Sequence, residues 1–107
     1  MAIRFNNYAR EVGRRGERSW YRWRVFVDEP PAVLARIESV DYVLHATFPN
    51  PNRTAKNSLD RFALESSGWG EFDLFITVHF RDGSTEEAQY WLDLRKSWGA
   101  TTTSSGN

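Results

Sequence analysis

One run of alternating residues constrains the fold of this chain more than any other feature of the sequence. From Glu71 to Arg81 every even position is apolar, and every odd position except Phe75 is polar. Such period-two alternation is typical of a β-strand with one face in a core and the other toward solvent. The even positions predicted to face the core are Phe72, Leu74, Ile76, Val78 and Phe80.

Several shorter segments carry the same signal. Residues 20–27 are rich in aromatic and β-branched side chains, and Asp82-Gly83 is a strong hairpin signal before a returning strand. Residues 10–18 are expected to form a flexible basic loop, and residues 49–60 a long excursion across the surface. The other segments with strand patterns are 2–8, 40–44, 62–64 and 86–94.

Together these segments predict an all-β fold. About seven to eight antiparallel strands, with no helix beyond one turn near residues 32–37, are typical of an immunoglobulin-like β-sandwich. At 107 residues the chain has the length of a single domain, which we expect to occupy residues 1–95. The polar residues 96–107 have the composition of a disordered C-terminal tail.

The composition excludes several classes of protein. The absence of cysteine rules out disulfides and zinc–thiolate sites, and 14 basic residues balance 14 acidic ones, so no overall charge favours nucleic acid. No apolar run approaches the roughly 20 residues that span a bilayer, and no secretory signal opens the chain. We therefore expect a cytoplasmic protein that binds no membrane. The sequence predicts no particular oligomeric state.

Few residues could support catalysis or metal binding. The candidate nucleophiles are Ser66, Ser67 and Thr47, and the candidate bases are His45 and His79. The run Ser-Ser-Gly-Trp-Gly is not the Gly-x-Ser-x-Gly elbow of a hydrolase, and no strand-to-helix turn is expected there. Two histidines on separate strands match no metal-ligand spacing. We therefore predict no enzyme, no metal site and no cofactor.

Two aromatic residues stand apart from the expected core. Phe48 immediately precedes a proline in a loop, and Trp69 lies between Gly68 and Gly70 just before the long strand. Flanking glycines leave backbone N–H groups accessible, and facing aromatic planes can hold a flat or apolar group between them. With the nearby hydroxyl of Thr47, these residues predict a small binding slot.

Two sequence motifs resemble those of a known family. Leu-His-Ala-Thr-Phe at 44–48 and Ser-Gly-Trp-Gly-Glu-Phe at 67–72 occur in the order and at the separation expected for it, after Trp-Arg-Val-Phe-Val at 23–27. The chain resembles the YEATS domain, an immunoglobulin-like reader of acylated lysine. The resemblance covers residues 20–94, and the compact chain looks more like the prokaryotic branch.

The resemblance implies a ligand and the residues that hold it. In the family, the acyl-lysine amide lies between two aromatic side chains, which correspond here to Phe48 and Trp69. The hydroxyl of Thr47 would hydrogen-bond the amide, and the backbone N–H of Trp69 would receive the acyl carbonyl. The implied partner is therefore a peptide or protein that carries acetyl- or crotonyl-lysine.

Further residues complete the slot by the same resemblance. His45 would line it, and Gly68 and Gly70 would shape its wall and its open end. An additional aromatic residue of many eukaryotic members falls near Ser19 and Trp20. An open end implies that acyl groups longer than acetyl are accepted.

Two other functions are open from the residues alone. Exposed aromatic residues could form a protein-interaction surface next to a vestigial slot, because large exposed aromatics are typical interface anchors. The first 24 residues hold seven arginines and two glutamates and could bind nucleic acid, although the balanced charge of the whole chain argues against it. The aromatic candidates are Trp20, Tyr21, Phe75 and Trp91.

Overall fold

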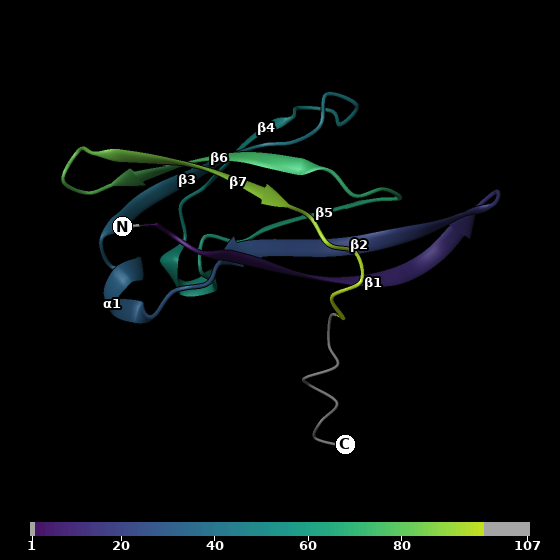
Figure 1. Ribbon diagram of the computed structural model, residues 1–107, viewed down its shortest axis with the longest axis horizontal. Coiled ribbons are helices and arrows are strands. Elements are labelled where there is room, and N and C mark those ends of the chain that lie inside the picture. The colour runs from purple at the N-terminus through teal and green to yellow at the C-terminus, as the bar shows by residue number, and fades with distance from the viewer. Residues whose placement is uncertain (1, 98–107) are drawn as a thin grey trace, which may run out of the picture.

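Two antiparallel sheets pack face to face in a computed structural model of the chain, which describes residues 2–97 (Figure 1). One sheet has the strand order β1–β2–β5, and the other has the order β4–β3–β6–β7. The predicted all-β, immunoglobulin-like sandwich is confirmed. The seven strands are β1 Phe5–Arg15, β2 Arg18–Val27, β3 Ile37–Val43, β4 Asn52–Ala55, β5 Leu64–Gly68, β6 Asp73–Phe80 and β7 Thr85–Trp91.

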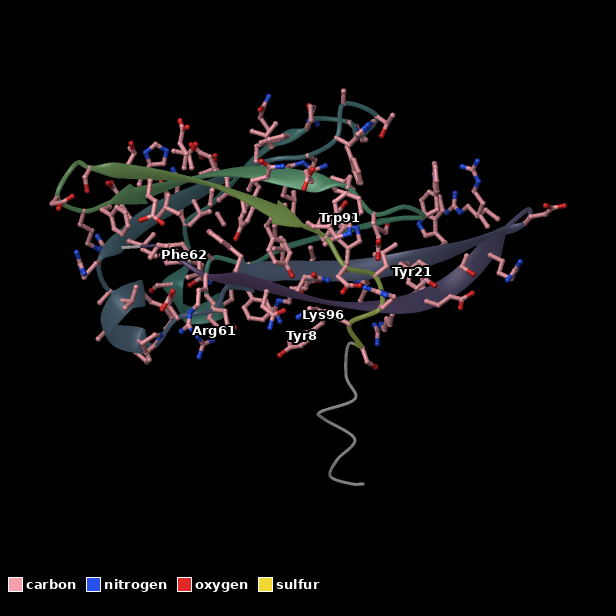
Figure 2. All side chains as sticks on the ribbon, viewed as in Figure 1. Tyr8, Tyr21, Arg61, Phe62, Trp91 and Lys96 are labelled. Carbon is pink, nitrogen blue, oxygen red and sulfur yellow. The ribbon has the colours of Figure 1, made fainter. Side chains whose placement is uncertain are left out.

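The core lies between the sheets and follows the predicted alternation. Leu74, Ile76 and Val78 of β6 are buried, whereas Phe75 among them is exposed. Fully burying an aliphatic side chain contributes roughly 1.5–3 kcal/mol, so these positions fix the register of the central strand. The largest fully buried side chains are Trp23, Tyr42 and Phe62, and Figure 2 shows Phe62 between the two sheets.

Helical structure within residues 2–97 is confined to two short segments. The turn expected near 32–37 is α1 Pro31–Leu34, where proline at the first position suits the helical backbone. The second segment is the 3₁₀ helix η1 Ser58–Asp60, whose capping residue Asn57 accepts the N–H of Leu59 at 2.9 Å. Neither segment has the length and apolar character that a membrane-spanning helix would need.

The N-terminal hairpin corrects two predictions. The sequence predicted a strand over 2–8 and a flexible loop over 10–18. Instead, β1 continues to Arg15, which pairs with Arg18, the first residue of β2. The turn between them is tight, with Gly16 at a φ of 64°. Because polar residues line both faces at its tip, this hairpin lacks the alternation that would identify it. It extends beyond the rest of the sandwich in Figure 1.

Two other segments predicted as loops contain strand. β4 lies within residues 49–60 and pairs with β3, so the expected surface excursion is interrupted by a short edge strand. The predicted loop over 66–70 is shorter than expected, because Ser66 to Gly68 form the end of β5. Ala55 is the single apolar residue of β4, so no hydrophobic period marks this edge strand in the sequence.

A buried asparagine joins the two sheets. Asn7 of β1 is fully buried, and its Nδ2 donates to the Asp93 carbonyl at 2.9 Å. Its Oδ1 accepts from the Tyr90 hydroxyl at 2.6 Å and from the Asp93 N–H at 3.1 Å. Burial raises the pKa of Tyr90 to about 12, so the phenol keeps the proton that it donates at neutral pH. Both polar atoms of Asn7 are thus satisfied, and the segment after β7 is fixed to β1.

The chain continues along β1 after this contact. The N–H of Ala9 donates to the Lys96 carbonyl at 2.7 Å, and Ser97 forms an isolated parallel bridge with Ala9. The Lys96 ammonium donates to Asn6 Oδ1 at 2.8 Å, on the face where Figure 2 labels Tyr8. The rest of the predicted tail, residues 98–107, lies outside the described residues.

Candidate ligand-binding site

A cavity of about 470 Å³ opens at one end of the sandwich, between the β3–β4 loop (44–51) and the β5–β6 loop (69–72). Its volume lies within the roughly 300–1,000 Å³ typical of small-molecule pockets. We call this cavity the slot. Six residues of its lining are those proposed from the sequence, namely His45, Thr47, Phe48, Gly68, Trp69 and Gly70. The structure therefore brings all six together at one place.

Hydrogen bonds fix the β3–β4 loop around His45. The loop is closed by the N–H of Leu44, which donates to the Pro51 carbonyl at 2.8 Å, and the Phe48 N–H donates to the His45 carbonyl at 3.0 Å. The Nδ1 atom of His45 lies 3.2 Å from the backbone N–H of Thr47 and 2.9 Å from its hydroxyl oxygen. Because a backbone N–H can only donate, Nδ1 is the acceptor, and the Thr47 hydroxyl donates to it. The lone pairs of that hydroxyl oxygen are left to accept from a ligand.

Aromatic rings form the floor of the slot. Phe48 packs against Phe72 with ring centroids 5.2 Å apart, and it meets Trp23 edge-on at 6.3 Å. Trp23 and Phe72 are themselves in edge contact at 6.0 Å. The indole N–H of Trp23 is buried without a hydrogen-bond partner in residues 2–97, so this ring contributes shape rather than polar contacts. Phe48 is therefore supported from beneath by the core.

Trp69 forms another wall, and the glycines beside it set the space around it. Half of the Trp69 side chain is exposed, at 52%. A Cβ added at Gly68 would lie 3.5 Å from Cζ of Phe48, which is an ordinary van der Waals contact, so the Phe48 ring lies close beside β5 here. A Cβ added at Gly70 would meet no atom within 4 Å. The Phe48 ring thus lies beside Gly68, whereas the space next to Gly70 is unobstructed.

The lining also includes residues that were not proposed as site residues. These are Trp20, Pro49, Ser67, Glu71 and Phe72. Trp20 precedes Tyr21, which forms the last pair between β2 and β5 with Gly68. The resemblance placed an additional aromatic residue near Ser19 and Trp20. This was the sequence signal that could have identified Trp20 as a residue of the slot. The Glu71 carboxylate is turned toward the C-terminal segment, where it accepts from Trp91 Nε1 at 3.1 Å and the Leu94 N–H at 2.9 Å.

Two arginines of the β1–β2 hairpin stack on tryptophans of the slot. The guanidinium carbon of Arg18 lies 3.8 Å from the centre of the Trp69 ring, and that of Arg15 lies 4.4 Å from the centre of the Trp20 ring. A guanidinium over an aromatic face is attracted by the ring's electron density. These contacts were not expected from the sequence, because residues 10–18 were predicted to form a flexible loop.

The second histidine lies on the outer face of the β4–β3–β6–β7 sheet, apart from the slot. His79 Nε2 is 2.7 Å from a carboxylate oxygen of Asp41, whose other oxygen accepts the Thr54 hydroxyl at 2.6 Å. The hydrogen bond from Thr54 and then that from His79 lower the pKa of Asp41. The hydroxyl donates to the carboxylate rather than to the imidazole, so this trio is not a nucleophile with its base. Across residues 2–97, no cluster of three potential metal ligands is present.

Comparison with known families identifies the fold and its relatives. The sequence model of the prokaryotic YEATS domain matches residues 21–93. The chain belongs to the prokaryotic YEATS family. YEATS domains are non-catalytic reader modules. Membership of this family therefore confirms the expectation of a binding protein rather than an enzyme.

Eukaryotic YEATS proteins are similar in sequence. The chain is 32% identical over 93 residues to the protein AF-9 homolog of Candida glabrata, an alignment that covers 80% of this chain and 41% of that protein. This YEATS domain thus spans about two fifths of the length of that curated relative.

Solved YEATS structures match most of the fold. The yeast AF-9 homolog Yaf9 superposes with a TM-score of 0.71 at 29% identity, covering 85% of this chain and 65% of that one. The Yaf9 YEATS domain recognising an H3K122suc peptide superposes with a TM-score of 0.69 at 27% identity, covering 89% and 78%. A structural relative of this YEATS domain therefore binds an acylated histone peptide.

Proposed function

We propose that this YEATS domain binds acylated lysine, with the amide held between Phe48 and Trp69. The observation that carries the proposal is the convergence of the two aromatic loop residues on one cavity, together with the Thr47 hydroxyl. A planar amide or a conjugated acyl group fits between aromatic faces because flat, polarisable groups stack on them. The Yaf9 complex with an acylated peptide supports the same ligand class.

The hydrogen bonds of the β3–β4 loop give Thr47 a defined role in this proposal. Its hydroxyl proton is directed to His45 Nδ1, so its oxygen accepts from the N–H of the acyl-lysine amide. The backbone N–H of Trp69 would donate to the acyl carbonyl. His45 thus acts through Thr47 by fixing the direction of the hydroxyl. An unmodified lysine lacks the acyl carbonyl that would accept from the Trp69 N–H, and its strongly hydrated ammonium would lose water on entering the slot, so we expect it to bind more weakly.

Peptide titration tests the proposal directly. Acetyl-lysine and crotonyl-lysine peptides are titrated into the protein while backbone amide shifts are followed by NMR, with the unmodified lysine peptide as the control. We expect the acylated peptides alone to shift the resonances of residues 45–48 and 66–70. If no resonance in these two segments moves at millimolar acylated peptide, the proposal is wrong.

Acyl length gives a second expected result. Crotonyl-lysine should bind more tightly than acetyl-lysine, because two further conjugated carbons add flat apolar contact along Phe48 and Trp69. At about 25 cal/mol per Å² of buried apolar area the gain is roughly 1 kcal/mol, or about fivefold in affinity. Isothermal calorimetry with the two peptides measures the ratio.

The Gly70→Val variant examines the open end of the slot. A Cβ added at Gly70 meets no atom within 4 Å, so a lost crotonyl preference in a variant that unfolds at the parent's temperature would report on the slot rather than on misfolding. Gly13→Val is the matched control, because a Cβ added there also meets no atom within 4 Å. Equal affinities in the parent protein would show that the slot is not open-ended, and an unchanged preference in Gly70→Val would show that no open end lies at Gly70.

A protein-interaction surface is the second candidate function. It is favoured by the exposure of Phe75 and Trp91, at 54% and 52%. The two other aromatics that the sequence suggested for such a surface are otherwise engaged, because Trp20 lines the slot and Tyr21 packs against the core. The peptide titration separates the two functions, since a domain with a vestigial slot would bind none of the acylated peptides.

A further inference from the structure

The rim of the slot carries two positive charges that come from the β1–β2 hairpin. Arg15 ends β1 and Arg18 begins β2, and the two residues form the last pair of the hairpin. Arg18 stacks on Trp69 and Arg15 stacks on Trp20, and both tryptophans line the slot. The rim is therefore cationic, although the chain as a whole has a formal net charge of zero.

Neither arginine is neutralised by the protein itself. Stacking uses the flat face of a guanidinium and leaves its N–H donors at the edge free for other partners. The arginines farther along β2, Arg22 and Arg24, pair with Glu65. In the part of the chain that the structure describes, no carboxylate forms an ion pair with Arg15 or Arg18. Guanidinium donors held in place on a ring are suited to bind a carboxylate from outside.

We propose that the acylated segment bound by this domain is acidic, with aspartate or glutamate residues near the acyl-lysine that pair with Arg15 and Arg18. The inference rests on the proposed function, because acyl-lysine in the slot is what brings the flanking residues to the rim. Successive residues of an extended peptide are about 3.3 Å apart. Carboxylates within three positions of the acyl-lysine therefore lie within about 10 Å of it along the peptide, close enough to meet the rim.

The charge distribution disfavours two other kinds of partner. A peptide rich in lysine or arginine would place like charges beside Arg15 and Arg18, and such juxtaposition is costly at an interface. A nucleic acid requires a broad positive surface that can contact several phosphates. Here Arg22 and Arg24 of β2 are paired with Glu65, and the lining of the slot also includes the Glu71 carboxylate, so the positive charge held against the slot is that of Arg15 and Arg18 on the two tryptophans. Two localised charges match a few carboxylates better than a phosphate backbone.

Peptides that differ only in their flanks test the proposal on the full chain. Each carries one crotonyl-lysine, with two aspartates, two serines or two lysines within three positions of it. We expect the aspartate peptide to bind about two- to thirtyfold more tightly than the serine peptide at low salt, the range given by two exposed ion pairs. The lysine peptide should bind more weakly than both. The difference should vanish at 1 M salt, where screening acts within about 3 Å.

Substitutions at the rim identify the residues responsible. Arg15→Gln and Arg18→Gln should each lower the ratio of aspartate-peptide to serine-peptide affinity, whereas Arg18→Lys should keep most of it because the charge is retained. The measured quantity is the ratio of aspartate-peptide to serine-peptide affinity. Loss of the Arg18 stack on Trp69 changes the affinity for both peptides alike and therefore leaves this ratio unaffected. Arg36→Gln is the matched control, because it removes the same charge next to α1, at the opposite end of the sandwich (Figure 1).

The outcomes separate this inference from the proposed function. Equal binding of the aspartate and serine peptides would overturn the acidic partner and leave acyl-lysine binding intact, whereas binding of neither peptide would end both. A flank effect that persists in the Arg15→Gln, Arg18→Gln double variant would also overturn it. The inference would also be overturned if succinyl-lysine bound more tightly than butyryl-lysine and the flanking residues had no effect. The arginines would then pair with the carboxylate of the acyl chain itself. Displacement of the aspartate peptide by a random oligonucleotide would assign the rim to nucleic acid instead.

Discussion

Replacing Trp69 by alanine is expected to weaken acyl-lysine binding by about 1–3 kcal/mol, or roughly five- to 150-fold, while the sandwich remains folded. The range is that of stacking on an aromatic ring, which the variant would lose on one side of the amide. The fold should persist because Trp69 is 52% exposed, is not part of the core cluster, and has the Arg18 guanidinium over its ring. Calorimetric titration of the crotonyl-lysine peptide and thermal unfolding of the free protein measure the two effects.

Phe75→Ala is the control for this substitution. Phe75 is 54% exposed, close to the 52% of Trp69, but it lies on the outer face of β6 and does not line the slot. The Phe75→Ala variant should therefore bind the crotonyl-lysine peptide with the same dissociation constant as the parent protein. A Trp69→Ala variant that binds as well as the parent would contradict the slot, and one that unfolds would show that the indole fills the core.

Replacing Asn7 by alanine is expected to lower the free energy of unfolding by about 2–4 kcal/mol. The variant leaves the Tyr90 hydroxyl, the Asp93 N–H and the Asp93 carbonyl without their buried partner, and each unsatisfied group costs about 1–3 kcal/mol if water does not replace it. It also releases the main link between β1 and the segment after β7. Urea denaturation followed by tryptophan fluorescence measures the loss.

Asn52→Ala provides the comparison, because Asn52 is exposed on β4, at the edge of its sheet. Its effect should stay within about 0.5 kcal/mol, as for most surface substitutions. If Asn7→Ala costs no more than Asn52→Ala, then Tyr90 and Asp93 find other partners, and the two sheets are held by apolar packing alone.

Hydrophobic alternation predicted the centre of this fold well. The buried even positions of β6 and the inward face of β2 at Trp23 and Val25 follow from the sequence, because a side chain that faces the core must be apolar. The Asp82-Gly83 signal also marked a true hairpin, in which Gly83 takes a φ of 91°. These features depend on local patterns, which a single sequence displays directly.

The elements that the sequence did not reveal are those with no apolar face to display. The tip of the β1–β2 hairpin and the edge strand β4 are held by backbone pairing while most of their side chains are polar, so no periodicity distinguishes them from loops. No sequence pattern marks Asn7 as buried, because only the fold brings it to Tyr90 and Asp93, more than 80 positions away. Long-range polar contacts of this kind are not encoded in any local pattern.

The sequence predicted the loop residues of the candidate site but not the residues that the β1–β2 hairpin brings to it. Phe48 and Trp69 stood out because a large aromatic in a turn has no place in a core, and two motifs supplied their neighbours. Trp20, Arg15 and Arg18 were missed as site residues because each lies on or beside a strand, and their approach to the slot depends on how far the hairpin projects. The sequence thus indicated the stacking surfaces but not the charges at the rim.

The ring cluster beneath the slot has a consequence for how such a domain can evolve. Phe48 and Phe72 touch Trp23, which is fully buried, so a change of shape in the floor is also a change in the packing of the sandwich. Trp69 and Gly70, by contrast, adjoin solvent or empty space. Substitutions around the mouth of the slot can therefore change ligand preference with little loss of stability, whereas substitutions in its floor also destabilise the sandwich. Duplicated copies of such a gene could diverge in what they recognise without first risking their ability to fold.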